Sequence, residues 1–438
     1  MEQITNRRVL GIALPILVSN ATIPLLGLVD TAVIGQLGEA APIGAVGVGG
    51  VILSTIYMLF MFLRMATSGL TAQAHGRRDR KEVALVLHRA LMLAAICGGG
   101  VIALQWPLLR GIFWFSPASD EVEVLARTYV SIRVWGAPAT VALYALTGWL
   151  IALERARQVL AVQLFVNGVN IALDVMFVFG FGFGVGGIAT ATLIGEWAGF
   201  GLALYLCRDA FLPALRSGWG ALLDRVALRQ TMSMNADLML RSVLLQFSYT
   251  SFVFLSAGQG DVDLAANQVL LQFLSLFSYL LDAFAFSAEA LVGQAIGARA
   301  LGPLRRAARL SGQWALGGSV FLSLASILGG PWLIALMTTS PEVQAEAARY
   351  LPWIWLLPLA SFGSYIFDGI FIGATMARQM RDVMFLSVLL YVATLVVALP
   401  FLGNHALWLA MMALNIARTL LMARAYPQVE AKAAPQMA

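Results

Sequence analysis

The nine residues "LTAQAHGRR" (70–78) return 221 positions later as "LVGQAIGAR" (291–299). The two strings share Leu, Gln, Gly and Arg in register, and the same offset, without a gap, aligns Tyr129 with Tyr350 and "ARQ" (156–158) with "ARQ" (377–379). One register that holds across several segments is typical of a duplicated architecture. The chain is therefore expected to consist of two related halves.

The composition indicates the solvent in which these halves fold. Of the 438 residues, 60% are hydrophobic and 12% are charged, which leaves too little polar surface for a water-soluble protein of this length. Runs long enough to cross about 30 Å of hydrocarbon lie at 9–36, 43–70, 90–115, 128–153, 158–182, 185–207, 230–257, 264–296, 310–337, 349–376, 383–402 and 405–425. The sequence predicts an all-α polytopic membrane protein with twelve transmembrane helices in two pseudo-symmetric six-helix bundles.

The duplication also sets the expected domain boundaries. We predict an N-terminal six-helix lobe over 1–207, a cytoplasmic connector over 208–229, a C-terminal six-helix lobe over 230–425 and a cytoplasmic tail over 426–438. An even number of helices in each repeat gives both lobes the same orientation, and transporters built in this way bind substrate between the halves. The alternative is a duplication that merely enlarges a membrane scaffold.

The distribution of basic residues predicts the orientation. Arginines and lysines gather in the even-numbered loops, around 77–89, 155–157, 208–229, 299–309 and 378–381, whereas the odd-numbered loops are mainly acidic. By the positive-inside rule both termini are cytoplasmic, and the pattern fits a multi-pass protein of a bacterial cytoplasmic (inner) membrane. The first run is too long and too polar for a signal peptide. The net charge of +5 follows from this topology, so no nucleic-acid partner is expected.

Polar residues inside the apolar runs are the candidate functional residues. The stretch "VNGVNIALDVMFVFGFGFGVGG" (166–187) holds Asn170 and Asp174, and a buried Asp costs roughly 2.5–3.5 kcal/mol on insertion scales. The topology puts Asp30, Asp174 and Thr192 at one level in the outer half of the membrane, with Asn170 one turn below Asp174. These groups predict a site for a proton or a cation. The alternative is that they only form hydrogen bonds to neighbouring helices.

This site is expected in the N-terminal half alone. The 221-residue offset places Ser251, Tyr391 and Leu395 opposite Asp30, Asn170 and Asp174. The C-terminal half has other carboxylates, which we expect toward the cytoplasmic side as substrate or secondary sites: Asp282, Glu289 and Asp368. Asp237 and Arg241 are four residues apart, which predicts an ion pair along one helix.

Two prolines interrupt the first predicted helix. Pro15 and Pro24 each remove a backbone hydrogen bond, so the segment that carries Asp30 is expected to bend when its charge changes. A static kink that serves packing is the alternative.

Signals for an enzyme are absent from the sequence. Cys97 and Cys207 have no paired spacing, the three histidines are scattered, and no HExxH or GxSxG motif occurs. We therefore expect no disulfide, metal centre, cofactor or catalytic residue, apart from a coupling ion.

Several strings resemble the multidrug and toxic compound extrusion (MATE) transporters. They are "PILVSNATIPLLGLVDTAVIGQLG" (15–38) and "NGVNIALDVMFVFGFGFGVGGIATAT" (167–192); "LLDAFAFSAEALVGQAIGAR" (280–299) and "FDGIFIGATMARQMRD" (367–382) are similar to the DNA-damage-inducible (DinF-like) branch. The resemblance implies efflux of amphipathic, often cationic compounds in exchange for protons, with sodium as the alternative ion. It also implies that Asp30, Asn170, Asp174 and Thr192 carry the coupling ion and that the first helix bends at Pro15. Some relatives have a tyrosine where this chain has Leu26.

The resemblance fixes the function that we expect. The leading hypothesis is a secondary antiporter, expected as a monomer in the lipid bilayer, for small amphipathic or cationic substrates. The alternative is a lipid or lipid-linked glycan flippase of the same superfamily, which a basic cavity would favour.

Overall fold

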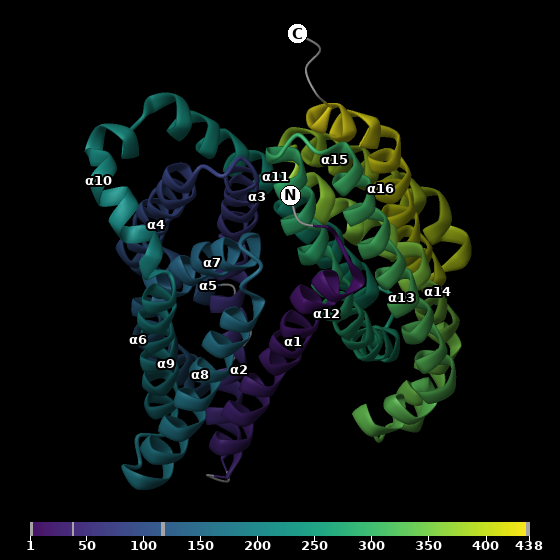
Figure 1. Cartoon of the computed structure of the whole chain (residues 1–438). Coiled ribbons are helices and arrows are strands. Elements are labelled where there is room, and N and C mark those ends of the chain that lie inside the picture. Colours follow the sequence, from purple (N-terminus) through teal and green to yellow (C-terminus); the bar gives the residue numbers. More distant parts are fainter. Residues whose placement is uncertain (1–2, 37–38, 115–118, 435–438) are drawn as a thin grey trace. The chain divides into compact units, whose positions relative to one another are not determined.

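A computed structural model describes residues 3–36, 39–114 and 119–434 of the protein (Figure 1). Within these ranges the chain is helical and holds no strand. Twelve of the described helical stretches are long and apolar enough to cross a membrane. The prediction of an all-α polytopic membrane protein with twelve transmembrane helices is confirmed.

The helices follow the sequence in two sets of six spans. The first set consists of α1 (Asn6–Gly35), α2 (Ala40–Met58) continued by α3 (Phe62–Gly76), α4 (Arg80–Ala103), α6 (Asp120–Arg133) continued by α7 (Ala137–Ala152), α8 (Ala156–Val175) and α9 (Gly184–Leu206). The short helices α5 (Gln105–Trp114) and α10 (Phe211–Leu222) follow α4 and α9. The second set consists of α11 (Arg225–Ala257), α12 (Asp261–Gly297), α13 (Leu301–Met337), α14 (Pro341–Gly373), α15 (Ala377–Leu402) and α16 (Asn404–Ala433).

Some helices extend beyond the apolar runs. The third run was predicted at 90–115, but α4 begins at Arg80 because Asp79 caps it, accepting a hydrogen bond from the backbone N–H of Glu82 at 2.9 Å. Hydropathy detects only the apolar part of such a helix, whereas a cap stabilises its polar first turn. Likewise α16 continues to Ala433, into the segment predicted as a tail, whose residues 435–438 lie outside the described part.

The backbone confirms the duplication. Positive φ angles at non-glycine residues, among those described, occur in two pairs separated by 221 positions: Arg78 (60°) with Arg299 (52°), and Glu154 (60°) with Thr375 (53°). A left-handed residue commonly ends a helix, but it is uncommon outside glycine. Both halves therefore leave their helices in the same way at equivalent loops.

Helix packing repeats with the same offset. A Cβ atom on Gly148 of α7 would overlap the backbone carbonyl of Arg64 in α3, and a Cβ atom on Gly369 of α14 would overlap the carbonyl of Ala285 in α12. The two glycines are 221 residues apart, and so are the two residues that they touch. Each half thus uses a glycine at one position to bring two helices into backbone contact.

The chain forms two compact units. The N-terminal unit consists of residues 18–71 and 79–229, and the C-terminal unit of residues 1–17, 72–78 and 230–438. The division falls inside α1, shortly after Pro15, although α1 continues as one helix through Pro15 and Pro24. Bending at these prolines stays a prediction.

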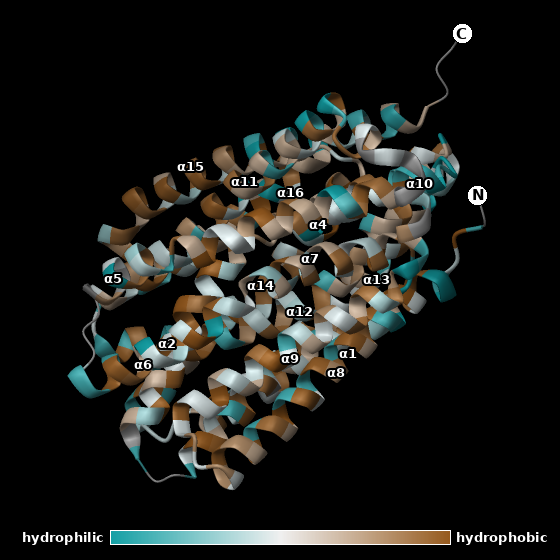
Figure 2. Cartoon of the chain, turned by 90° about the vertical axis from the view of Figure 1, so that its left-hand side faces the viewer, coloured by the Kyte–Doolittle hydropathy of each residue, from teal (hydrophilic) through white to brown (hydrophobic). Residues whose placement is uncertain are grey.

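Each unit has its own apolar core, and its outer surface is apolar as well. In the C-terminal unit, Phe252, Tyr391 and Trp408 are fully buried. On α15, by contrast, Phe385, Val396 and Phe401 are exposed, and Figure 2 shows this helix as hydrophobic over most of its length. Exposed apolar surface of this extent marks contact with a nonpolar partner, here the lipid of the membrane.

Candidate functional site

An acid–amide cluster lies inside the N-terminal unit. It consists of Asp30 on α1, Asn170 and Asp174 on α8, and Thr192 on α9, all of them buried. The amide nitrogen of Asn170 donates to Asp174 Oδ2 at 2.9 Å and to Asp30 Oδ1 at 3.2 Å, while the amide oxygen accepts from Thr192 Oγ1 at 2.9 Å. This orientation follows from the neighbours, because the reverse would place the amide oxygen against two carboxylates. The structure therefore brings together all four residues predicted for the ion site.

Local sequence explains how α8 and α9 present these groups. Asn170 and Asp174 are one helical turn apart, so they share a face of α8. Gly195 lets α9 approach that face, since a Cβ there would lie 3.3 Å from the carbonyl oxygen of Val166. Directly after Asp174 and Val175 the helix widens into a π-turn at Met176–Gly180, a distortion that is frequent at functional sites.

The cluster has unused capacity to bind a cation or a proton. Oxygen Oδ1 of Asp174 is buried and has no hydrogen-bond partner among the described residues. Asp30 and Asp174 lie within hydrogen-bonding reach of each other, and Arg133 acts electrostatically on both. Two carboxylates that share one amide in a low-dielectric site repel each other unless something positive joins them. The arrangement can therefore hold a proton or a small hard cation.

This unit holds a second polar group, of which sequence reasoning missed Glu196. Arg133, at the end of α6, forms an ion pair with Glu196 of α9 and donates to Tyr129 Oη at 2.9 Å, while Tyr57 Oη donates to the carbonyl of Arg133 at 3.2 Å. Gly136 makes room for the pair, because a Cβ there would overlap Glu196 Oε2. An acid alone in the apolar sequence of α9 was the signal that could have revealed Glu196.

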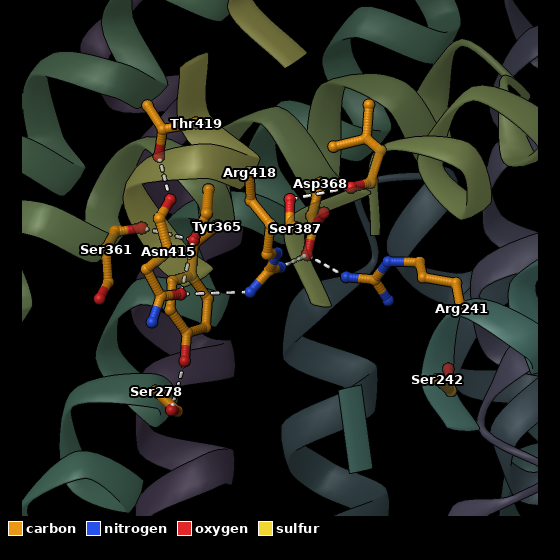
Figure 3. Close-up of polar contacts among 12 residues, drawn as sticks. Arg241, Ser242, Ser278, Ser361, Tyr365, Asp368, Ser387, Asn415, Arg418 and Thr419 are labelled. Carbon is orange, nitrogen blue, oxygen red and sulfur yellow. Dashed lines mark hydrogen bonds and ion pairs between the residues drawn. The ribbon is translucent and has the colours of Figure 1, made fainter. Parts of the chain in front are cut away.

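The C-terminal unit holds a cluster of opposite character (Figure 3). We call it the arginine cluster: Arg241 of α11 and Arg418 of α16 both donate to Oδ2 of Asp368 of α14, Arg418 at 2.6 Å. Both arginines are buried, with 3% and 4% exposure. Asn415 steadies Arg418, since its Oδ1 accepts from the guanidinium at 3.2 Å and from Ser364 Oγ at 3.3 Å.

The predicted ion pair between Asp237 and Arg241 is wrong. Asp237 accepts from Arg381 of α15 at 2.6 Å, and Arg241 pairs with Asp368 instead. Helical spacing shows which residues can meet on one helix. Here Asp237 and Arg241 both form ion pairs with residues of other helices instead.

The other two predicted carboxylates of this unit lie on α12. Asp282 is half-buried and acts electrostatically on Arg241, so it belongs to the surroundings of the arginine cluster. Glu289 is fully buried two turns further along, where its backbone carbonyl touches Gly373. The structure therefore groups Asp282 with Asp368 and places Glu289 elsewhere.

Within the described ranges, the cysteines and the candidate metal ligands do not gather into a cluster. Cys97 and Cys207 are both free, and burial raises the pKa of the Cys207 thiol to about 12, which keeps it protonated and unreactive. Among the described residues no group of three or more His, Cys, Asp or Glu side chains could hold a metal ion.

Twelve spanning helices in duplicated sets, with charged clusters buried inside each unit, define a polytopic membrane transporter. The family model described as MatE matches this chain twice, over residues 15–176 and 238–399. The chain is also 40% identical to the DNA damage-inducible protein F of Escherichia coli (strain K12), over 91% of this chain and 87% of that protein. The protein belongs to the MatE family and is a transporter with a DinF-type sequence.

Further relatives and solved structures agree with this assignment. A probable multidrug resistance protein NorM of Neisseria meningitidis serogroup A is 24% identical over 81% of this chain and 79% of its own length. A MATE protein in a bent conformation has a TM-score of 0.87 at 19% identity, covering 97% of this chain and 96% of that one. A transporter of the MOP superfamily from Pyrococcus furiosus, described with a binding pocket of reverse polarity, has a TM-score of 0.83 at 20% identity, covering 98% and 96%. At these identities the structures show the fold alone.

Proposed function

We propose that this protein is a secondary antiporter that exports amphipathic or cationic compounds in exchange for protons, with sodium as the alternative coupling ion. Its place is a bacterial inner membrane, with both termini in the cytoplasm, and it works as a monomer without a cofactor. The names of the relatives support drug export, since several are probable multidrug resistance proteins. The basic even-numbered loops support the orientation.

The observation that carries this proposal is the pair of carboxylates on one buried amide. With Asp30 and Asp174 both ionised, two negative charges would lie within hydrogen-bonding reach in a site of low dielectric. One proton or one sodium ion removes that repulsion. Occupancy of the site therefore changes the local energy strongly, which is what a coupling site requires.

The position of Asp30 on α1 couples ion binding to the conformation of this helix. Asp30 lies in the part of α1 that belongs to the N-terminal unit, whereas residues 1–17 belong to the C-terminal unit. An ion that enters from outside neutralises Asp30 and alters how this part of α1 is held against α8. Substrate and ion are coupled when each prefers a different facing state of the protein, and Pro15 and Pro24 are the positions at which α1 bends between them.

A flippase for lipids or lipid-linked glycans is the second candidate. The observation that favours it is the arginine cluster, because two buried guanidinium groups are suited to a phosphate. The acid–amide cluster favours the antiporter, since paired carboxylates suit the coupling ion that antiport requires.

The deciding experiment measures uptake of a fluorescent lipophilic cation into inside-out proteoliposomes with an acidic lumen, with and without sodium. We compare the wild type with Asp174→Asn and with Asp261→Asn, which changes an exposed acid at the start of α12. Sodium-independent uptake that is lost only in Asp174→Asn supports the proton antiporter. Gradient-driven uptake that survives in Asp174→Asn, or no uptake with either ion, contradicts the proposal.

A further inference from the structure

We propose that the arginine cluster of the C-terminal unit binds the carboxylate of an amphipathic organic acid or zwitterion, which the protein then transports. This inference rests on the proposed transport function and adds a chemical class of substrate. Arg241 and Arg418 bind the negative group of the substrate. Asp368 competes with the substrate for these two arginines.

The hydrogen bonds of the cluster are incomplete. Both guanidinium groups donate to the same oxygen of Asp368, Oδ2. Oxygen Oδ1 of Asp368 and the Nε atoms of Arg241 and Arg418 are buried without a hydrogen-bond partner among the described residues. Buried polar groups are nearly always paired, so three unpaired groups in one cluster indicate a site whose remaining partner comes from a ligand.

The charges identify the sign of that ligand. Two arginines share the carboxylate of Asp368, and the charge of Asp282 acts on Arg241. Two guanidinium groups repel a metal ion, which makes the cluster unsuited to a cation. Arginine is the residue best matched to planar oxyanions, because its N–H groups form a rigid fork.

Asp368 shows which anion fits. Its carboxylate already occupies the oxyanion position between Arg241 and Arg418, so the carboxylate of a substrate can take the same place. A phosphate with two negative charges fits less well, because Asp368 and Asp282 both remain nearby and repel the second charge.

The surroundings of the cluster suit the apolar part of an amphiphile. Tyr249 and Tyr365 lie close enough to Arg418 to sense its charge and present aromatic rings, and the hydroxyl of Tyr365 is hydrogen-bonded with Ser278 Oγ at 2.5 Å. The side chain of Asp368 keeps 13% exposure, more than either arginine. A ligand would therefore reach the cluster at Asp368.

The test measures binding of two fluorescent probes to the purified full-length protein in a neutral maltoside detergent. The probes are 11-(dansylamino)undecanoic acid and its primary amide, which differ only in the carboxylate. The wild type is expected to bind the acid about tenfold more tightly than the amide, the order of one charge-assisted hydrogen bond. Equal affinities for the two probes would overturn the proposal.

Two variants separate ligand binding from a purely structural part. Asp368→Asn removes the internal competitor, so the affinity for the acid should rise severalfold while that for the amide stays the same; a merely structural Asp368 would lower both. Arg418→Lys keeps the charge but loses the fork, and it should reduce the preference for the acid severalfold in a protein that still folds. A preference that neither variant changes would refute the assignment.

Two further arms separate the rival sources and the two proposals. If dodecyl phosphate displaces the acid probe better than dodecanoic acid does, the arginine cluster prefers a lipid phosphate. That result would overturn the proposal of a carboxylate ligand. Uptake of the lipophilic cation by the same protein after reconstitution into proteoliposomes tests the proposed antiport independently, because binding in detergent needs no gradient. Carboxylate binding without cation export would contradict only the proposed antiport of cations. Cation export without a preference for the carboxylate probe would contradict only this inference.

Discussion

The two units use the same backbone plan with different chemistry at equivalent positions. In the N-terminal unit the amide of Asn170 donates to Asp30 at 3.2 Å. Their counterparts at the 221-residue offset, Tyr391 and Ser251, also touch, with hydroxyl oxygens 3.1 Å apart. The contact between the two helices is therefore kept in both units, while the carboxylate is present in only one. Duplication has preserved the packing geometry and left the polar groups free to specialise.

The charges of the two units differ in sign as well as position. The acid–amide cluster gathers two carboxylates, whereas the arginine cluster gathers two guanidinium groups around one carboxylate. At the offset of 221, no member of the arginine cluster has a charged counterpart; the equivalents of Arg241, Asp368 and Arg418 are Asn20, Thr147 and Trp197. One unit is thus suited to a cation or proton and the other to an anionic group.

The largest effect on stability is expected when the chemistry of one unit is placed in the other. Leu395, the counterpart of Asp174, is buried in the apolar core beside Tyr391. Leu395→Asp should lower the free energy of unfolding by roughly 3 kcal/mol, because no amide receives the new charge. Steric trapping in bicelles measures this, with Leu395→Asn as the uncharged control of similar size. If both variants cost the same, charge is not what distinguishes the two units at this position.

The reverse exchange should separate function from stability. In Asp174→Leu, gradient-driven transport should fall about 100-fold, since the coupling ion loses one of the two carboxylates of its site. The free energy of unfolding should stay the same or rise, because replacing a buried charge by an apolar side chain is often stabilising. Transport rates in proteoliposomes and unfolding in bicelles give the two readouts. A variant that is strongly destabilised would indicate that Asp174 mainly holds the helices together.

The sequence was sufficient to predict the fold and the acid–amide cluster. Apolar run lengths give the spans, a single offset gives the duplication, and helical spacing places Asn170 and Asp174 on one face. Depth in the membrane then brings Asp30 and Thr192 to the same level. These four residues were predictable because topology fixes their depth in the membrane, and the cost of exposing a carboxylate to lipid turns it toward the protein interior.

The arginine cluster was not predictable from the sequence, for a physical reason. Arg241, Asp368 and Arg418 lie on three different helices, and no local pattern says how those helices are rotated about their axes. The spacing of Asp237 and Arg241 suggested an ion pair within one helix, but both residues pair with residues of other helices. Glu196 was missed in the same way, because its partner Arg133 is distant in the sequence.

The same substitution at the two equivalent glycines tests whether helix packing in the two units is still alike. Gly148→Ala and Gly369→Ala each place a methyl group against a backbone carbonyl and should each lower the free energy of unfolding by about 1–3 kcal/mol. Gly168→Ala in α8 and Gly317→Ala in α13 are the controls, because nothing lies within 4 Å of an added Cβ at either position. They should be neutral or slightly stabilising. Clearly different costs for Gly148→Ala and Gly369→Ala would show that the packing of the two units has diverged as well.

The smallest effect concerns the ion pair of Asp237 with Arg381, whose side chains are 16% and 29% exposed. Because the pair is partly solvated, a double-mutant cycle with Asp237→Asn and Arg381→Gln should give a coupling energy of about 0.5 kcal/mol in the free energy of unfolding. The same cycle with Arg241→Gln should give a coupling near zero, since residues without shared contacts add independently. A larger coupling of Asp237 to Arg241 than to Arg381 would restore the partner that helical spacing suggests. In that case Arg241 would pair with Asp237 and not with Asp368. The contrast between the acidic and the basic unit would then be weaker.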